Sequence, residues 1–240
     1  MFSLASALSF LADPGAPDPR LPAPPAPDPG ARRAWRPGFF PIGLASGRDG
    51  VLHLPASLPR DRAVPLLVML HGGGGEARSA ITLLRPHAER LGFAVLAPES
   101  RGRGWRLGEA GAAQPDLAFV SAALRRVYGS IPVDPQRVAI AGFSSGGRFG
   151  LALTLANGDW LRAGLIFAAG DGLPRVVRRG RPKIVVTHGR IDPGPSFRGA
   201  ANEIVRPLQA AGYPVSFHPF DGGHEMPPFQ IARALDVWLS

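Results

Sequence analysis

Five residues in the middle of the chain, Gly142-Phe143-Ser144-Ser145-Gly146, have the types and spacing of a reactive serine at a tight turn. They directly follow the apolar run at residues 138–141, which predicts a buried strand. A serine at such a turn is strained, and glycines two positions before and after it let the neighbouring chain pass close by. This spacing selects Ser144 over Ser145, which has Phe143 where a small residue is needed. Because so short a pattern also arises by chance, the rest of the chain must support it.

Other chemistry-bearing residues follow other predicted strands. A glycine run with a leading histidine, residues 71–75, follows one strand, and the segment Pro98-Glu99-Ser100-Arg101-Gly102-Arg103-Gly104-Trp105 follows the next. Asp192 follows the seventh strand and His224 the eighth. Ligands of open parallel sheets bind beyond the carboxyl ends of the strands. We therefore expect these residues to gather at one edge of a sheet.

Strand-like and helix-like patterns alternate along the chain and predict an α/β fold. Eight strands are expected at residues 40–45, 50–54, 65–70, 93–97, 138–141, 164–168, 183–187 and 215–219. Helices are expected at residues 77–91, 115–128, 147–156, 197–211 and 228–239. The later strands are continuously apolar, as in strands covered on both faces. The pattern predicts a mostly parallel sheet with helices on both faces and an antiparallel edge made by the first two strands.

Composition and charge exclude several classes of protein. The 240 residues contain no cysteine, which removes disulfides and thiolate chemistry. The net charge of +9 comes almost wholly from scattered arginines, and Lys183 is the only lysine. The one dense basic cluster runs from Arg175 to Lys183 and is interpreted as a solvated connector, with an anion-binding patch as the alternative. We expect no nucleic-acid partner.

The N-terminal part differs in composition from the rest. Residues 13–37 are rich in Pro, Ala, Gly and Asp, so residues 1–37 are expected to form a disordered leader before a catalytic domain at residues 38–240. No apolar stretch is long enough to cross a bilayer. Residues 1–12 are apolar but lack a basic start. A cytoplasmic location is therefore favoured, with an atypical secretion signal as the alternative.

The chain order Ser144, Asp192, His224 resembles that of the α/β-hydrolase fold, within its esterase branch. The resemblance covers roughly residues 40–240. The segment 98–105 and the short connections between strands resemble bacterial phospholipase/carboxylesterases and polyhydroxybutyrate-depolymerase-like esterases. The resemblance implies an eight-stranded, mostly parallel sheet. The short connection at residues 171–182 implies that no large cap domain covers the site.

The resemblance also implies a role for each of these residues. Ser144 would be the nucleophile, His224 its base, and Asp192 the acid that orients the imidazole. Three other acids lie at strand ends. Asp171 is the main rival to Asp192, whereas Asp221 and Glu225 are too close in sequence to His224 to orient it. His71 and His188 each precede a glycine at a strand end and are expected to hydrogen-bond loop backbone.

The oxyanion donors are expected to be backbone N–H groups. Ser145, which follows Ser144 at the start of a helix, is expected to supply one donor, and Gly73 is expected to supply the second, with Gly74 as the alternative to Gly73. A phosphate cradle is excluded because the glycine run lacks the Gly-Lys-Ser/Thr ending. Substrate contacts are predicted at Trp105, Gly74 and Arg101.

Together these features predict a serine carboxylic-ester hydrolase that works through an acyl-enzyme and needs no cofactor or metal. Its substrate would be a small or oligomeric ester with a short-chain, aromatic or polyester-type acyl group. Two alternatives remain open, namely the same triad acting on a peptide or thioester and a non-catalytic binding protein of this fold. The oligomeric state is left open.

Overall fold

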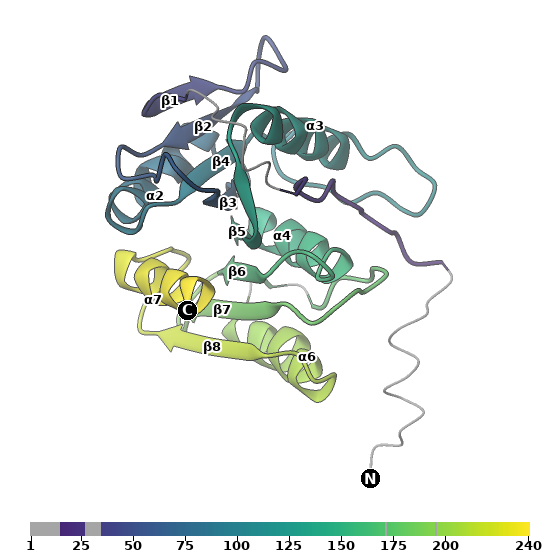
Figure 1. The fold of residues 1–240 in the computed structure, drawn as a ribbon. Coiled ribbons are helices and arrows are strands. Elements are labelled where there is room, and N and C mark those ends of the chain that lie inside the picture. Colours follow the sequence, from purple (N-terminus) through teal and green to yellow (C-terminus); the bar gives the residue numbers. More distant parts are fainter. Residues whose placement is uncertain (1–14, 27–34, 171, 195) are drawn as a thin grey trace.

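The computed structural model describes residues 15–26, 35–170, 172–194 and 196–240. Its centre is one eight-stranded sheet with the strand order β1-β2-β4-β3-β5-β6-β7-β8 (Figure 1). β1 pairs with β2 and β2 with β4 in antiparallel fashion, and the other neighbours are parallel. The strands are β1 (Gly38–Pro41), β2 (Gly50–Leu54), β3 (Val64–Leu70), β4 (Ala94–Pro98), β5 (Val133–Phe143), β6 (Ala163–Phe167), β7 (Lys183–Gly189) and β8 (Val215–Phe220). The predicted sheet is confirmed.

The central strands are apolar on both faces because helices cover both faces. Every residue of β3 is buried. Leu66, Val68 and Leu70 pack into one hydrophobic cluster, and Leu67 and Met69, which alternate with them, pack into another. This alternation follows from the two-residue period of a strand. The continuous apolar runs of the sequence therefore have a direct structural cause.

Two groups of helices form the outer layers (Figure 1). α2 (Ala77–Leu91) and α7 (Pro228–Leu239) pack on one face and share a core cluster. α3 (Pro115–Ser130) and α4 (Ser145–Ala156) pack on the other face. A helical segment made of α5 (Phe197–Gly199), η1 (Ala200–Val205) and α6 (Arg206–Ala210) follows β7, and residues of η1 and α6 share a core cluster with α4. The expected helices are present, although the one predicted at residues 197–211 contains a π-helical turn at η1.

The predicted strand at residues 40–45 is shifted. β1 spans Gly38–Pro41 instead, and its register with β2 ends at the pair Pro41 and Val51. The carboxylate of Asp49 accepts hydrogen bonds from the backbone N–H groups of residues 43–45. Those N–H groups are therefore unavailable for strand pairing, and the chain turns.

The connection between β6 and β7 contains the basic cluster and, within the described residues, no helix. Val176 is buried, and Arg178 and Arg179 are partly buried, so the cluster is not simply a solvated connector. A cap domain is absent from this described connection, as the sequence predicted. No helix in the described parts of the chain combines the length and the apolar character needed to cross a membrane.

Residues 15–26, which we call the N-terminal strap, differ from the expectation of a disordered leader. Ala16 and Leu21 are buried, and the strap makes hydrogen bonds and ion pairs with the folded domain. A proline-rich segment lacks the N–H groups needed for regular strand pairing. Its carbonyl groups can still accept hydrogen bonds, and its charged side chains can form ion pairs, with residues far away in the sequence. The expectation for residues 1–14 and 27–34 concerns residues outside the described ranges.

Candidate active site

Ser144 lies at a strained turn between β5 and α4. Its φ of 54° and ψ of −118° are unusual for a residue other than glycine. Its backbone N–H donates to the carbonyl of Phe167 at 2.9 Å, which ties the turn to β6. A Cβ on Gly142 would lie 2.2 Å from the carbonyl oxygen of Gly146, and one on Gly146 would lie 2.4 Å from those of Leu70 and His71. Both flanking positions therefore require glycine, as the spacing predicted.

An acid and a base meet on the loops after β7 and β8. Oδ2 of Asp192 lies 2.8 Å from Nδ1 of His224, and the Asp192 side chain is fully buried. Its Oδ1 accepts from the N–H of Gly194 at 2.8 Å. The two loops touch so closely that a Cβ on Gly189 would lie 2.2 Å from the carbonyl oxygen of Gly222. The buried carboxylate is thus positioned to fix the orientation of the imidazole.

His188 is a member of this site that the sequence did not reveal. It was expected to bond loop backbone, but its Nε2 lies 3.2 Å from Oδ2 of Asp192, and its side chain is completely buried. Oδ2 of Asp192 therefore contacts two imidazoles. The only signal of this contact in the sequence is the four-residue spacing from His188 to Asp192. That spacing does not predict a contact unless the geometry of the loop is known.

His224 packs against Phe143, the residue directly before Ser144. The rings of Phe143 and His224 lie 4.8 Å apart between centroids, which places this imidazole beside the strained turn. Within the described residues no hydrogen bond joins the Ser144 hydroxyl to His224. Such bonds are often long before substrate binds and tighten in the Michaelis complex.

The glycine loop after β3 favours Gly73 over Gly74 as an oxyanion donor. The N–H of Gly74 donates to the carbonyl of Arg103 at 2.5 Å, and that of Gly75 donates to Gly72 at 3.0 Å. Among the described residues, the N–H groups of Gly73 and Ser145 have no backbone acceptor. Ser145 begins α4, where the first N–H groups of a helix lack partners and point toward a ligand.

His71 and Arg48 hold this glycine loop in place. Nδ1 of His71 lies 2.7 Å from the carbonyl oxygen of Gly72, and Nε2 accepts from the N–H of Ser100 at 3.1 Å. The Arg48 guanidinium donates to the carbonyl of Gly75 and pairs with Glu99 at 3.0 Å. His71 has the structural role expected of it. Arg48 lies in a loop far from any motif and was missed.

The two side chains predicted to contact substrate have different positions. Trp105 lines the cavity beside Ser144, but it is only 7% exposed, stacks on Phe149 and donates from Nε1 to the carbonyl of His71. Arg101 lies over the ring of Phe119, 3.6 Å from its centroid, and donates to the carbonyls of Arg48 and Glu99. Arg101 therefore supports the loop and does not line the cavity.

The two rival acids within the described residues, Asp221 and Glu225, have other partners. Asp171 lies outside the described residues. The Asp221 side chain is 95% exposed and pairs with Arg190 at 3.3 Å, and Glu225 accepts from the N–H of Gly223. In the described ranges, no group of three or more His, Asp or Glu side chains is arranged to hold a metal ion.

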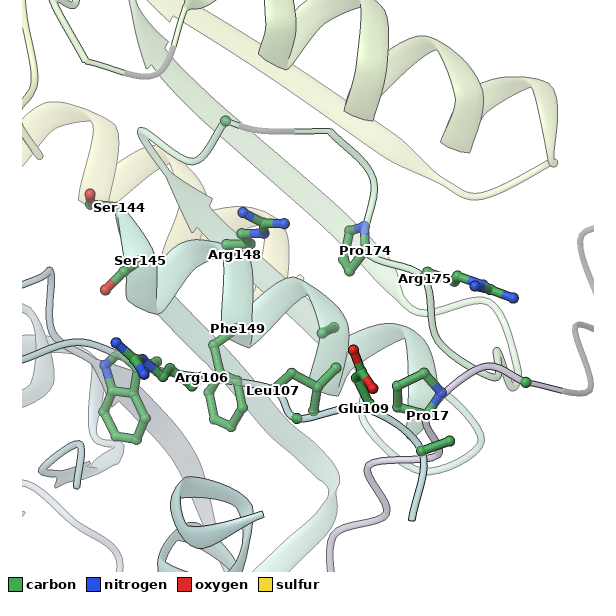
Figure 2. A pocket seen from close by; sticks show the side chains of 16 residues that line it. Pro17, Arg106, Leu107, Glu109, Ser144, Ser145, Arg148, Phe149, Pro174 and Arg175 are labelled. Carbon is green, nitrogen blue, oxygen red and sulfur yellow. The ribbon is translucent and has the colours of Figure 1, made fainter. Parts of the chain in front are cut away.

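A cavity of about 940 Å³ opens beside Ser144 (Figure 2). Its floor is the side of α4, including Phe149 and Ala152, and one wall is the loop after β4, including Trp105 and Leu107. Three arginines and one glutamate lie around it, namely Arg106, Arg148, Arg175 and Glu109. The far end is lined by Pro17 of the N-terminal strap. The site thus combines an apolar floor with a positively charged rim.

The fold and this geometry agree with a comparison to known families. The model of the alpha/beta hydrolase family matches residues 67–239, well over half of the chain. The chain therefore belongs to the alpha/beta hydrolase family, and the resemblance inferred from the sequence is confirmed.

Curated relatives include two esterases. NocK of Nocardia uniformis subsp. tsuyamanensis, a protein named as an esterase, is 32% identical over 172 residues, which are 65% of this chain and 49% of NocK. This chain thus spans about half the length of that relative. Feruloyl esterase C of Emericella nidulans is 25% identical over 232 residues, covering 81% of this chain and 82% of the relative.

Solved structures show the same fold. The crystal structure of a thermostable esterase has a TM-score of 0.63 at 20% identity and covers 79% of this chain, which spans 58% of that structure. The Bacillus cereus carboxylesterase has a TM-score of 0.58 at 20% identity, covering 78% of this chain and 92% of that structure.

Gly146→Ala tests the tight contact at the turn. The added Cβ would meet backbone carbonyls that cannot move without shifting β3, so we expect a loss of about 3 kcal/mol in the free energy of unfolding. Gly129→Ala is the matched control, because Gly129 lies in α3 with open space around it and should gain up to about 1 kcal/mol. Urea unfolding measures both. Equal effects would show that the contact is not tight.

The neutral state of His71 predicts a pH-dependent stability. Burial, as the largest cause, lowers the pKa of His71 below its ordinary value of 6.5. As the pH falls below 6.5, His71 therefore becomes protonated in the unfolded chain while it stays neutral in the folded protein. The free energy of unfolding consequently decreases as the pH drops from 6.5 to the lower pKa of the folded state. Thermal melts of His71→Gln between pH 7.5 and 5 should start lower and decline less steeply than those of the parent. An identical decline would contradict this role.

Proposed function

We propose that this protein hydrolyses carboxylic esters with Ser144 as nucleophile, His224 as general base and Asp192 as the orienting acid. The observation that carries the proposal is the 2.8 Å hydrogen bond between a buried carboxylate and an imidazole that packs on Phe143, the residue before a strained serine. The esterase names of the relatives support the same class of reaction.

The first half of the reaction forms an acyl-enzyme. Nε2 of His224 takes the proton of the Ser144 hydroxyl as its oxygen attacks the ester carbonyl carbon. Asp192 accepts from Nδ1–H of His224, so Nε2 is left unprotonated and can act as the base. The buried carboxylate then stabilises the imidazolium, and the leaving alcohol receives the proton from Nε2.

The oxyanion is stabilised by the N–H groups of Gly73 and Ser145. Both groups belong to rigid elements, because His71 and Arg48 hold the glycine loop and Ser145 begins α4. Donors that are already oriented cost little reorganisation, and each is typically worth about 3 kcal/mol of barrier. Water then attacks the acyl-enzyme with His224 again as base, which releases the acid and restores Ser144.

The cavity supports esters with short-chain, aromatic or polyester-type acyl groups. Its floor includes the aromatic ring of Phe149 and its wall the side chain of Leu107, so an apolar acyl group is the part that it can bury. The relative named feruloyl esterase C favours an aromatic acyl group among these. The described connection between β6 and β7 has no helical cap, which leaves the site open to extended substrates.

Ser144→Ala tests the nucleophile. We expect hydrolysis of 4-nitrophenyl acetate to fall by at least about 10³-fold with little change in melting temperature, because the oxyanion donors alone give only residual catalysis. A fluorophosphonate should label Ser144 in the parent protein. Labelling of Ser145, or substantial activity in Ser144→Ala, would contradict the assignment. Matched 4-nitroanilides test the peptide alternative in the same assay.

Asp192→Asn tests the acid. The amide would donate to Nδ1 and leave the wrong tautomer of His224, so kcat should fall by about 10⁴-fold. Asp221→Asn is the matched control, because this exposed acid is three residues from His224 and pairs only with Arg190 among the described residues. It should retain nearly full kcat. A comparable loss in both variants would assign the effect to charge and not to geometry.

A further inference from the structure

The N-terminal strap is fastened by two arginine–carboxylate pairs. Asp18 pairs with Arg179 of the β6–β7 connection through contacts of 2.5 and 2.8 Å, and Arg20 pairs with Asp159 through two contacts of 2.8 Å. Arg20 also donates at 2.7 Å to the carbonyl of Ala156, the last residue of α4. A cation at this position satisfies a carbonyl that the helix leaves unpaired and interacts favourably with the helix dipole.

A buried amide joins the strap to the end of the same helix. Asn157 is fully buried, and its Nδ2 donates to the carbonyls of Leu153 at 2.8 Å and Pro19 at 2.9 Å. Its Oδ1 accepts from the N–H of Leu21 at 2.9 Å. Buried polar groups need such partners, and here the strap supplies two of the three. The docked strap is therefore part of the folded domain.

Two further contacts hold the strap on either side. The N–H of Val177 donates to the carbonyl of Pro17 at 3.0 Å, and the hydroxyl of Tyr128 on α3 donates to the carbonyl of Pro22 at 3.1 Å. Val177 and Arg179 both belong to the basic β6–β7 connection. This connection therefore binds the strap at Pro17 and Asp18, where the strap lines the cavity.

The strap lines the end of the cavity that lies away from Ser144. α4 begins directly after Ser144, and Ala152, which lines the cavity, is eight residues further on. At a rise of 1.5 Å per residue, the floor extends about 12 Å from the serine. Figure 2 shows Ser144 and Pro17 at opposite ends of the cavity, with Phe149 and Leu107 between them.

We propose that the N-terminal strap is a specificity element that closes the far end of the cavity and limits the length of the acyl group. This inference rests on the proposed function, because the acyl group must start at Ser144. An apolar acyl chain would lie along α4 over Phe149 and Ala152 and would meet Pro17 when it is too long. Shorter chains would not reach the strap.

The absence of cysteine from the chain allows a reversible test. Pro17→Cys would carry the only thiol, and benzyl methanethiosulfonate would form a mixed disulfide there while methanesulfinate leaves. The benzyl group should lower kcat/KM for 4-nitrophenyl octanoate about tenfold relative to acetate, because methylene groups lose their burial. Dithiothreitol should restore the ratio. Arg62→Cys, labelled in the same way, is the control and should show no change.

The opposite change should lengthen the preferred substrate. Asp18→Ala combined with Arg20→Ala removes both ion pairs and the bond to Ala156, so kcat/KM for octanoate should rise severalfold relative to acetate. Asp61→Ala combined with Arg62→Ala removes the same two charges at positions that make no ion pair in the described structure, and it should leave the ratio unchanged.

The outcomes separate this inference from the proposed function. If acetate hydrolysis depends on Ser144 but full labelling of Pro17→Cys leaves the octanoate-to-acetate ratio unchanged, the strap proposal is overturned and the esterase proposal stands. If Ser144→Ala remains active, both proposals fall. A lowered ratio that dithiothreitol restores supports the strap as the wall.

Discussion

The close approach of Gly146 to the end of β3 is the constraint on which the rest of the site depends. The first turn of α4 packs so tightly against the carbonyls of Leu70 and His71 that no side chain fits between them. This contact fixes α4 relative to the glycine loop, and the same contact forces the strained φ of Ser144. Backbone strain of this kind persists only where the surroundings over-determine it. The proposed nucleophile and both candidate oxyanion donors are therefore positioned by this one packing contact.

The acid and base depend on a second close approach, between the loops after β7 and β8. Burial of the Asp192 carboxylate would be costly without partners, and it has His224, His188 and the N–H of Gly194. Two imidazoles at one oxygen of the carboxylate restrict its orientation more than one hydrogen bond would. We therefore propose that His188 positions this carboxylate, whereas His224 is the proposed base.

Local signals in the sequence predicted the sheet, the helices and the turn at Ser144, because strand and helix periods and the glycine spacing act over a few residues. Strand order along the chain also brought Asp192 and His224 to one edge. Contacts between distant segments could not be predicted in the same way. Arg48 contacts His71 and Glu99, and Arg101 lies over the ring of Phe119. These contacts depend on the folded arrangement of segments that are far apart in the sequence. The contacts of the strap could not be predicted for the same reason, since its partners lie more than a hundred residues away.

The two ends of α4 have different roles. The N-terminus contributes to the proposed oxyanion site, and the C-terminus binds the strap that is proposed to limit substrate length. At its N-terminus, unpaired N–H groups and the positive end of the dipole favour a developing oxyanion. At its C-terminus, the unpaired carbonyls and the Asn157 amide attract Arg20 and the strap backbone. Because both partners are bound to one rigid helix, the distance between them is set by the number of helical residues and not by flexible loops. A change in strap sequence can therefore alter the length of the cavity without disturbing the triad.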